Sequence, residues 1–279
     1  MVSDSQFFAK NLNIKRAKRI RSACFLFKRV SGELELNAFK LMYSRLADFI
    51  IENLDFERIS AILEAGCGRG QLTIPFAKKL DKIKGKFKII TFDISAGPYE
   101  GNLEILKERI KKEKLDKFIA AVKGDVRNMK VIEDESIDLI ISNELFCDLD
   151  RKGLESALME FYRILKPNRQ MAHGELNPAA ENEAQKLLIE ANAYSLETTQ
   201  PKPEWFSPFS DEVAALMHKI GFKNITVKYF ETNVKMNFNK SIEKLKEWKT
   251  DPAFIERHLN DLKGYGMEFP MEHVIFCQK

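Results

Sequence analysis

Short apolar runs alternate along this chain with longer segments in which apolar residues are three or four positions apart. Short apolar runs are typical of buried strands, and the three- or four-residue spacing is typical of helices that pack along one face. Strands are predicted at about 62–65, 87–92, 118–122, 137–142, 170–176, 225–230 and 273–277. Helices are predicted at about 7–30, 34–53, 72–80, 102–114, 154–165, 181–193, 211–219 and 241–262. The alternation of strand and helix favours an α/β fold.

Two segments indicate how these elements pack. The run Leu139-Ile140-Ile141 is apolar without alternation, as expected of a central strand that is covered on both faces. The helix at 34–53 carries one apolar stripe, formed by Leu36, Phe39, Tyr43, Leu46 and Ile50. We expect this stripe to pack against the core. A lid over a cofactor is the alternative, because the helix immediately precedes the first strand.

Helix ends are also marked in the sequence. Lys166-Pro167 is a stop signal after the helix at 154–165. Ser210 or Asp211 is expected to cap the helix that continues through Lys219, and Gly221 is expected to end it.

Three glycines follow the first predicted strand at alternate positions, Gly66, Gly68 and Gly70. Residues without a Cβ let the backbone turn sharply and let a flat ligand lie against the main chain. The dinucleotide fingerprint G-x-G-x-x-G would need a glycine at position 71, where the chain has Gln71. The spacing therefore argues against NAD, and a merely structural turn is the alternative.

Together with Glu64, these glycines form an E-x-G-x-G-x-G loop. This loop resembles that of the Rossmann-like (class I) S-adenosylmethionine-dependent methyltransferases. The resemblance implies that Glu64, Gly66, Gly68 and Gly70 contribute to binding S-adenosylmethionine.

An aspartate closes the second predicted strand. Asp93 comes 23 residues after Gly70, near the interval of about 20 at which an acidic residue accepts hydrogen bonds from a ribose diol. We expect Asp93 to bind the cofactor ribose, with a turn former or helix cap as the alternative.

Two further cofactor contacts follow from the resemblance. After the third strand comes Gly124-Asp125-Val126. In the family, an aspartate here bonds the adenine amino group, so Asp125 is expected to do so and Val126 to present its backbone N–H to the ring. A plain turn is the alternative.

The fourth strand ends at Asn143 and Glu144. Ligands of open α/β sheets bind outside the carboxyl ends of the strands, so both residues are expected near the reaction centre, Asn143 beside the cofactor. The stretch faintly resembles the Ser-Glu loop of protein arginine methyltransferases, but Asn143 separates Ser142 from Glu144, which weakens an arginine acceptor.

Glu144 is the first candidate to orient the methyl acceptor, and Glu175 in the fifth strand is the second. A carboxylate at the acceptor can stabilise the positive charge that develops there. The alternative for Glu144 is a helix-start or surface carboxylate. His173, in the same strand as Glu175, is either a general base or, more commonly for a strand histidine, a packing residue.

Charge is unevenly distributed. The net charge of +4 combines about +7 over residues 1–32 with about −3 over the remainder. A basic amphipathic stretch can meet RNA, an acidic partner or an anionic substrate, and a solvated helix face is the plainer interpretation.

The cysteines give no sign of a metal site or a disulfide framework, because Cys24, Cys67, Cys147 and Cys277 lack C-x-x-C spacing. No metal is therefore expected. With no apolar run long enough to span a membrane and no secretory signal, we expect a cytoplasmic protein.

The expected fold is a doubly wound, mostly parallel seven-stranded sheet with a helical N-terminal extension and a substrate-side cap. The extension is assigned to residues 1–54 and the methyltransferase domain to 55–279, with cap insertions at about 177–209 and 240–265. The resemblance covers roughly residues 60–176, and the late last strand is similar to the antiparallel hairpin with which the family completes its sheet.

The resemblance implies S-adenosylmethionine-dependent methyl transfer to a nucleophilic acceptor, and a small metabolite is the acceptor we expect. The run Arg163-Ile164-Leu165-Lys166-Pro167 looks like a segment common in methyltransferases of small metabolites. No N/D-P-P-Y/F follows the fourth strand, and Phe146 rather than proline precedes Cys147, which argues against the two nucleobase chemistries. The alternatives are a protein or RNA methyltransferase guided by the basic N-terminus, and a non-catalytic scaffold that binds the cofactor.

Overall fold

The computed structural model describes residues 38–83, 85–193 and 209–279. The chain divides into two units, Met1–Lys40 and Leu41–Lys279, and the second contains the sheet. The basic stretch at 1–32 and the aromatic loop at 201–206 lie outside the described residues. The predicted domain division stays a prediction.

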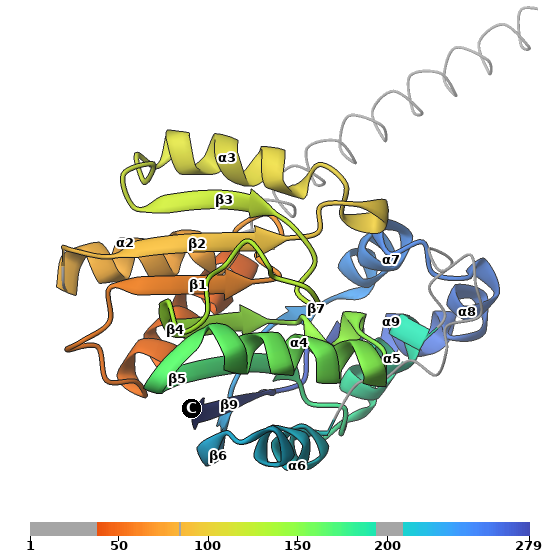
Figure 1. Ribbon diagram of the computed structural model, residues 1–279. Helices are drawn as coiled ribbons and strands as arrows, with labels where there is room; N and C mark the ends of the chain where they lie inside the picture. Colours follow the sequence, from red (N-terminus) through yellow and green to blue (C-terminus); the bar gives the residue numbers. More distant parts are fainter. Residues whose placement is uncertain (1–37, 84, 194–208) are drawn as a thin grey trace, which may run out of the picture. The chain divides into compact units, whose positions relative to one another are not determined.

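Seven strands form one mixed sheet in the order β3-β2-β1-β4-β5-β9-β6 (Figure 1). The strands are β1 (Ala61–Ala65), β2 (Lys88–Asp93), β3 (Ile119–Lys123), β4 (Ile137–Asn143), β5 (Leu165–Leu176), β6 (Lys223–Phe230) and β9 (Glu272–Gln278). The first five pair in parallel, whereas β9 runs antiparallel to both β5 and β6. The predicted seven-stranded, mostly parallel α/β fold is confirmed, including the antiparallel return at the end.

Eight labelled helices connect and flank the strands within the described residues, in addition to a helix at 38–52. They are α2 (Thr73–Ile83), α3 (Asn102–Lys112), α4 (Arg151–Ile164), α5 (Glu183–Ala193), α6 (Ser210–Ile220), α7 (Phe238–Glu247), α8 (Pro252–Arg257) and α9 (Leu259–Gly264). The single helix predicted at 241–262 is therefore three shorter helices. Lys249 interrupts it with a positive φ, and Pro252 then starts α8.

Two other sequence predictions need correction. The helix α4 ends just before Lys166-Pro167, as predicted. However, no loop follows it, because β5 begins directly at Leu165 and includes Lys166-Pro167. The N-cap position of α6 is occupied by Phe209, whose backbone is extended, and no side chain caps this end of the helix. The prediction of Ser210 or Asp211 as the cap is therefore wrong, because both residues already belong to the helix. Gly221 ends the helix as predicted.

The sheet has two differently covered faces. Face A carries Leu63, Ala65, Ile140, Met171 and Ile275, and these residues form one core with the buried sides of α4 and α6. Face B carries Ile62, Glu64, Ile141, Ala172 and Phe276, which alternate with the first set along the same strands. Both faces are therefore covered, as the uninterrupted apolar run in β4 predicted.

The helix at 38–52 packs on face B through its second half. Leu46 and Ile50 are fully buried, and the ring of Phe49 lies 6.3 Å from that of Phe276. The predicted packing of the stripe is confirmed for these residues. Leu36 lies outside the described residues.

A separate two-stranded sheet joins β7 (Lys235–Met236) to β8 (Met267–Glu268), which lie before α7 and after α9. This pairing brings together the two ends of the segment that contains α7, α8 and α9. None of the helices in the described part of the chain has the length and apolar character needed to cross a membrane.

Asp138 connects the amino ends of three strands. Its Oδ2 accepts hydrogen bonds from the backbone N–H of Ser60 and Ala61 and from the Ser60 hydroxyl, at 2.9 to 3.0 Å. Its Oδ1 lies 2.8 Å from Nζ of Lys166. Burial alone would raise the pKa of Asp138, but the hydrogen bonds from Lys166, Ala61 and Ser60 hold it well below its ordinary value.

Asp138→Asn is expected to reduce the free energy of unfolding at pH 7 by about 1 to 3 kcal/mol, because several charge-assisted bonds are lost. A carboxylate with a lowered pKa stabilises the fold above its unfolded pKa, and this contribution disappears as the pH falls. Urea unfolding should therefore show a smaller gap between variant and wild type at about pH 3 than at pH 7. The exposed Asp116 provides the control, since Asp116→Asn should change stability by less than about 0.5 kcal/mol. If the difference in free energy of unfolding between Asp138→Asn and the wild type did not change with pH, the lowered pKa of Asp138 would be contradicted.

Candidate functional site

The glycine loop leaves β1 by a turn that is tied to the neighbouring strand. The N–H of Gly66 donates to the carbonyl of Phe92 at 2.8 Å, and Gly66, Gly68 and Gly70 all have positive φ angles. A Cβ on Gly66 would lie 2.8 Å from the end of the Leu145 side chain, and one on Gly70 would clash with the end of the Leu106 side chain. The positive φ angles and these close neighbours both disfavour a larger residue at the two positions.

Gly68 differs from the other two glycines. A Cβ there would meet only the side-chain oxygen of Gln71, at 3.6 Å. Gly68 is therefore the position at which the missing side chain leaves room for a ligand against the backbone.

Asp93 ends β2 and holds the loop in place. Its Oδ2 accepts from the N–H of Gly68 and its Oδ1 from the N–H of Ser95, both at 2.8 Å. Each carboxylate oxygen has a second lone pair, so Asp93 keeps acceptor capacity for a ribose hydroxyl. The structure thus places Asp93 beside the glycine loop, as the sequence predicted.

Glu64 lies behind the loop on face B. It pairs with Thr91 on β2 and with Ile141 on β4, and its side chain is 3% exposed. Burial raises the pKa of Glu64 to about 8, with Thr73 opposing the shift and the charge of Asp93 adding to it. Among the described residues, no group bonds its Oε2.

These features fit the nucleoside cofactor that the resemblance implies. The loop has open space at Gly68, Asp93 presents acceptors for a diol, and a buried oxygen of Glu64 awaits a donor. Such an orphaned acceptor costs free energy unless a bound molecule satisfies it.

Asp125 and Val126 follow β3 on the other side of Asp93. The N–H of Gly124 donates to the carbonyl of Asp93 at 2.9 Å, which keeps this turn close to the loop. Asp125 is paired with Arg127 through both carboxylate oxygens, and the side-chain hydrogen bonds of Arg127 lower its pKa. The side chain of Val126 is buried in the core. An adenine amino group would have to share Asp125 with Arg127, so the adenine contact stays a prediction.

Asn143 and Glu144 lie where β4 ends, next to β5. Asn143 pairs with Gly174, and the N–H of Glu144 donates to the carbonyl of Gly174 at 2.9 Å. Glu144 has a positive φ of 47°, a conformation uncommon for residues other than glycine. Burial, followed by the charges of Glu175 and Asp148, raises the pKa of Glu144 to about 7.

Glu175 is fully enclosed on face A. Its Oε2 accepts from the backbone N–H of Phe146 at 3.1 Å and of Cys147 at 3.2 Å. Burial raises the pKa of Glu175 to about 7, although these bonds oppose the shift. The structure therefore brings the two predicted acceptor carboxylates, Glu144 and Glu175, to the same end of the sheet.

The surroundings of His173 favour the packing interpretation over a general base. Its Nδ1 lies 2.8 Å from the hydroxyl of Ser142, and its ring stacks on Phe146. Burial lowers its pKa to about 3, so the ring is neutral near pH 7. Burial and the charge of Glu175 raise the pKa of Cys147, and a raised pKa disfavours the thiolate form that a cysteine nucleophile needs.

Sequence reasoning missed Glu272. This residue begins β9, pairs with Leu176 and is fully buried. Because β9 is antiparallel to β5, its amino end meets the carboxyl ends of the parallel strands. The only signal was the family resemblance, which implies an antiparallel last strand, and Glu272 comes directly before the strand predicted at 273–277.

Tyr99 lies near both the loop and the acidic end of β4. Burial and the charge of Asp148 are the main causes that raise its pKa, and Asp93 contributes to the same shift. The glycine loop also approaches the end of β4 directly, because Leu145, which follows Glu144, lies against Gly66.

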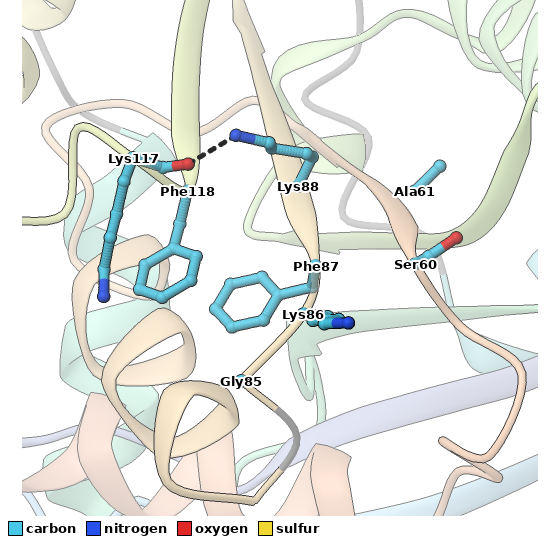
Figure 2. A pocket seen from close by; sticks show the side chains of 8 residues that line it. All are labelled: Ser60, Ala61, Gly85, Lys86, Phe87, Lys88, Lys117 and Phe118. Carbon is cyan, nitrogen blue, oxygen red and sulfur yellow. Dashed lines mark hydrogen bonds between the residues drawn. The ribbon is translucent and has the colours of Figure 1, made fainter.

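A hollow with a cavity volume of about 490 Å³ lies at the opposite edge of the sheet (Figure 2). The rings of Phe87 and Phe118 stack there with centroids 4.4 Å apart, and three lysines, Lys86, Lys88 and Lys117, surround them. It lies at the amino ends of the strands, whereas ligands of such sheets bind at the carboxyl ends.

Comparison with known proteins agrees with this geometry. A family model described as a methyltransferase domain matches residues 62–168. The chain is similar to a malonyl-[acyl-carrier protein] O-methyltransferase of Priestia megaterium, with 30% identity over 112 residues, or 40% of this chain. The match spans only 35% of that relative's length.

Solved structures share the fold. A SAM-dependent methyltransferase from Archaeoglobus fulgidus has a TM-score of 0.54 at 21% identity, over 91% of this chain and 99% of that one. A phospholethanolamine N-methyltransferase 2 of Haemonchus contortus, solved with phosphomonomethylethanolamine and S-adenosylhomocysteine, has a TM-score of 0.53 at 14% identity, over 84% of this chain and 52% of that one. At these identities the likeness concerns the fold.

Glu64→Gln is expected to flatten the pH dependence of stability. The carboxyl changes from its ordinary pKa of 4.5 to about 8 on folding, so the folded chain binds more protons between these values. Stability of the ligand-free wild type should therefore fall across this window as the pH rises, by up to about 1.4 kcal/mol per pH unit from this group. Denaturant unfolding between about pH 5 and pH 8 should show a shallower slope for the variant.

The control is Glu108→Gln, at an exposed position on α3, which should keep the wild-type slope. Parallel slopes for Glu64→Gln and the wild type would contradict the assigned role of the buried carboxyl.

Proposed function

We propose that this chain, a class I S-adenosylmethionine-dependent methyltransferase with its methyltransferase domain at residues 62–168, transfers the methyl group of S-adenosylmethionine to a nucleophilic acceptor. One observation carries the proposal. The loop held by Asp93 and the carboxylates Glu144 and Glu175 lie at the carboxyl ends of neighbouring strands, which supports a donor site and an acceptor site side by side.

In this proposal Glu64, Gly68 and Asp93 hold the cofactor, assisted by Asp125, the backbone of Val126 and Asn143. Bound S-adenosylmethionine supplies an electrophilic methyl group on a sulfonium sulfur. The chain itself has to orient the acceptor, exclude water and accept any proton that the acceptor loses. Alignment of this kind is worth on the order of 7 to 11 kcal/mol in favourable cases.

A small metabolite is the favoured acceptor. Glu175 is enclosed and Glu144 is only partly exposed, which suits a compact acceptor better than a long polymer. The relative from Priestia megaterium is an O-methyltransferase and the neighbour from Haemonchus contortus an N-methyltransferase, so together they leave the acceptor atom open. A protein or RNA acceptor guided by the basic segment at 1–32, or a cofactor-binding scaffold without turnover, is the competing proposal.

The purified chain is expected to bind S-adenosylmethionine and S-adenosylhomocysteine in titration calorimetry, and not NAD. Asp93→Ala should weaken this binding by roughly tenfold or more, because charge-assisted hydrogen bonds are worth about 1.5 to 3 kcal/mol. Part of the loss comes through Gly68, whose N–H loses its acceptor.

Asp81→Ala, at an exposed position on α2, is the matched control and should leave the affinity unchanged. Circular dichroism should show that both variants are folded. Binding of NAD in place of the sulfonium compound would reject the assignment, and wild-type affinity in a folded Asp93→Ala chain would remove Asp93 from the cofactor site.

A further inference from the structure

Four side chains form what we call the acidic site: Asn143, Glu144, Glu175 and Glu272. Asn143 and Glu272 approach Gly174 from face B, since a Cβ there would lie 2.5 Å from Oδ1 of Asn143 and 2.8 Å from Oε2 of Glu272. Glu175 lies on face A, and Glu144 lies beyond the end of β4 between them. Three carboxylates therefore surround the end of β5.

The acidic site contains acceptors that lack donors. Glu272 is fully buried, and among the described residues neither of its carboxylate oxygens has a hydrogen bond of good geometry, although the nearby side chain of Asn143 opposes the rise that burial causes in its pKa. The side-chain oxygen of Asn143 is equally buried and unbonded. Buried acceptors in this number are costly in an empty site and require either protons or a ligand with several N–H groups.

Other charged and titratable groups face the acidic site. Asp148 adds negative charge near Glu144, whereas Lys244, which also pairs with Glu247 at 3.1 Å, adds the opposing positive charge. His173 and His273 lie on the face of Glu175, and burial lowers the pKa of both, so they contribute no cation near pH 7. The surroundings thus contain more acidic groups and acceptor oxygens than cationic groups.

Aromatic groups complete the surroundings. The hydroxyl of Tyr43, on the helix at 38–52, lies close enough to Glu144 and Glu272 for their charges to raise its pKa, in addition to burial. Tyr99 lies on the side of Asp148. Two phenol groups therefore lie near the acidic residues, and a phenol can both donate and accept a hydrogen bond.

We infer that the acidic site receives the methyl acceptor as an ammonium ion, and that the acceptor is therefore a primary or secondary amine rather than a hydroxyl or carboxylate compound. This inference rests on the proposed methyl transfer and specifies its acceptor atom. An ammonium group brings two or three N–H donors to the oxygens of Glu144, Glu272 and Asn143. A neutral alcohol brings one donor, and a carboxylate brings none and is repelled.

The proton balance also suits an amine. The ammonium nitrogen gives one proton to the carboxylate of Glu144, whose pKa of about 7 makes it a base near neutral pH. The freed lone pair forms the nitrogen–carbon bond as the sulfur–carbon bond of the bound donor breaks, which leaves a thioether and a methylammonium product. Positive charge develops on nitrogen, and the remaining carboxylates stabilise it. The proton on Glu144 then passes to water.

The described residues give no support to a metal ion in the same place. No set of three His, Cys, Asp or Glu side chains in the described parts of the chain is arranged to hold one.

The test is calorimetry on the chain loaded with S-adenosylhomocysteine, using 2-phenylethylamine, 2-phenylethanol and phenylacetate as matched probes. We expect the amine to bind at least tenfold more tightly than the alcohol, and phenylacetate not to bind. Amine affinity should rise between about pH 6 and pH 8 as the carboxylates ionise, and titrations in buffers of different ionisation enthalpy should show proton release.

Two variants locate the effect. Glu272→Gln and Glu144→Gln should each reduce the preference for amine over alcohol by about tenfold and leave S-adenosylhomocysteine affinity within about twofold. Each removes a charge from a crowded site, so the fold should be kept. Glu104→Gln, at an exposed position on α3, should change neither affinity.

The outcomes separate the two proposals. Equal affinity for amine and alcohol in a chain that binds S-adenosylhomocysteine would overturn the amine acceptor and leave methyl transfer intact. A chain that binds the amine but not S-adenosylhomocysteine would keep the acidic site as an amine site and refute the proposed function. Amine preference that survives in both glutamine variants would also overturn the assignment.

Discussion

The parallel pairing of β1, β2, β4 and β5 determines where everything else in this protein lies. Because parallel strands end at the same edge, the glycine loop, Asp93 and Asn143 are brought together although they come from distant parts of the sequence. The hydrogen bond from Gly68 to Asp93 then fixes the loop to the neighbouring strand. A ligand can use this edge because the backbone there is already held.

The strand β9 runs antiparallel to β5, so its amino end lies beside the carboxyl ends of the parallel strands. Its antiparallel course brings Glu272 and His273, the first residues of the strand, beside Leu176 and Glu175, near the end of β5. This is how an acidic residue close to the C-terminus joins carboxylates from the middle of the chain. The sheet order thus concentrates negative charge next to the loop, and its cost in stability is the ordinary cost of buried, partly unsatisfied carboxylates.

Glu64, Glu144, Glu175 and Glu272 all have raised pKa values, and burial is the largest cause in each case. Residues elsewhere in the sheet, such as Asp138, pair their charges fully and have a lowered pKa. The contrast separates the two ends of β4: the amino end is built for stability, whereas the carboxyl end keeps acceptors without donors. Buried carboxyl groups with raised pKa values are commonly found where a ligand binds.

The sequence by itself determined the order of strands and helices, the glycine loop and the positions of Asp93, Asn143, Glu144 and Glu175 at strand ends, because these depend on local periodicity and spacing. It could not determine that Asp125 pairs with Arg127 or that Phe209 occupies the N-cap position of α6, since these depend on side-chain and backbone conformations. Glu272 joined the site only in the tertiary structure. Its neighbours lie about a hundred residues away in the chain, and an antiparallel strand pairing, which no local pattern specifies, brings them together.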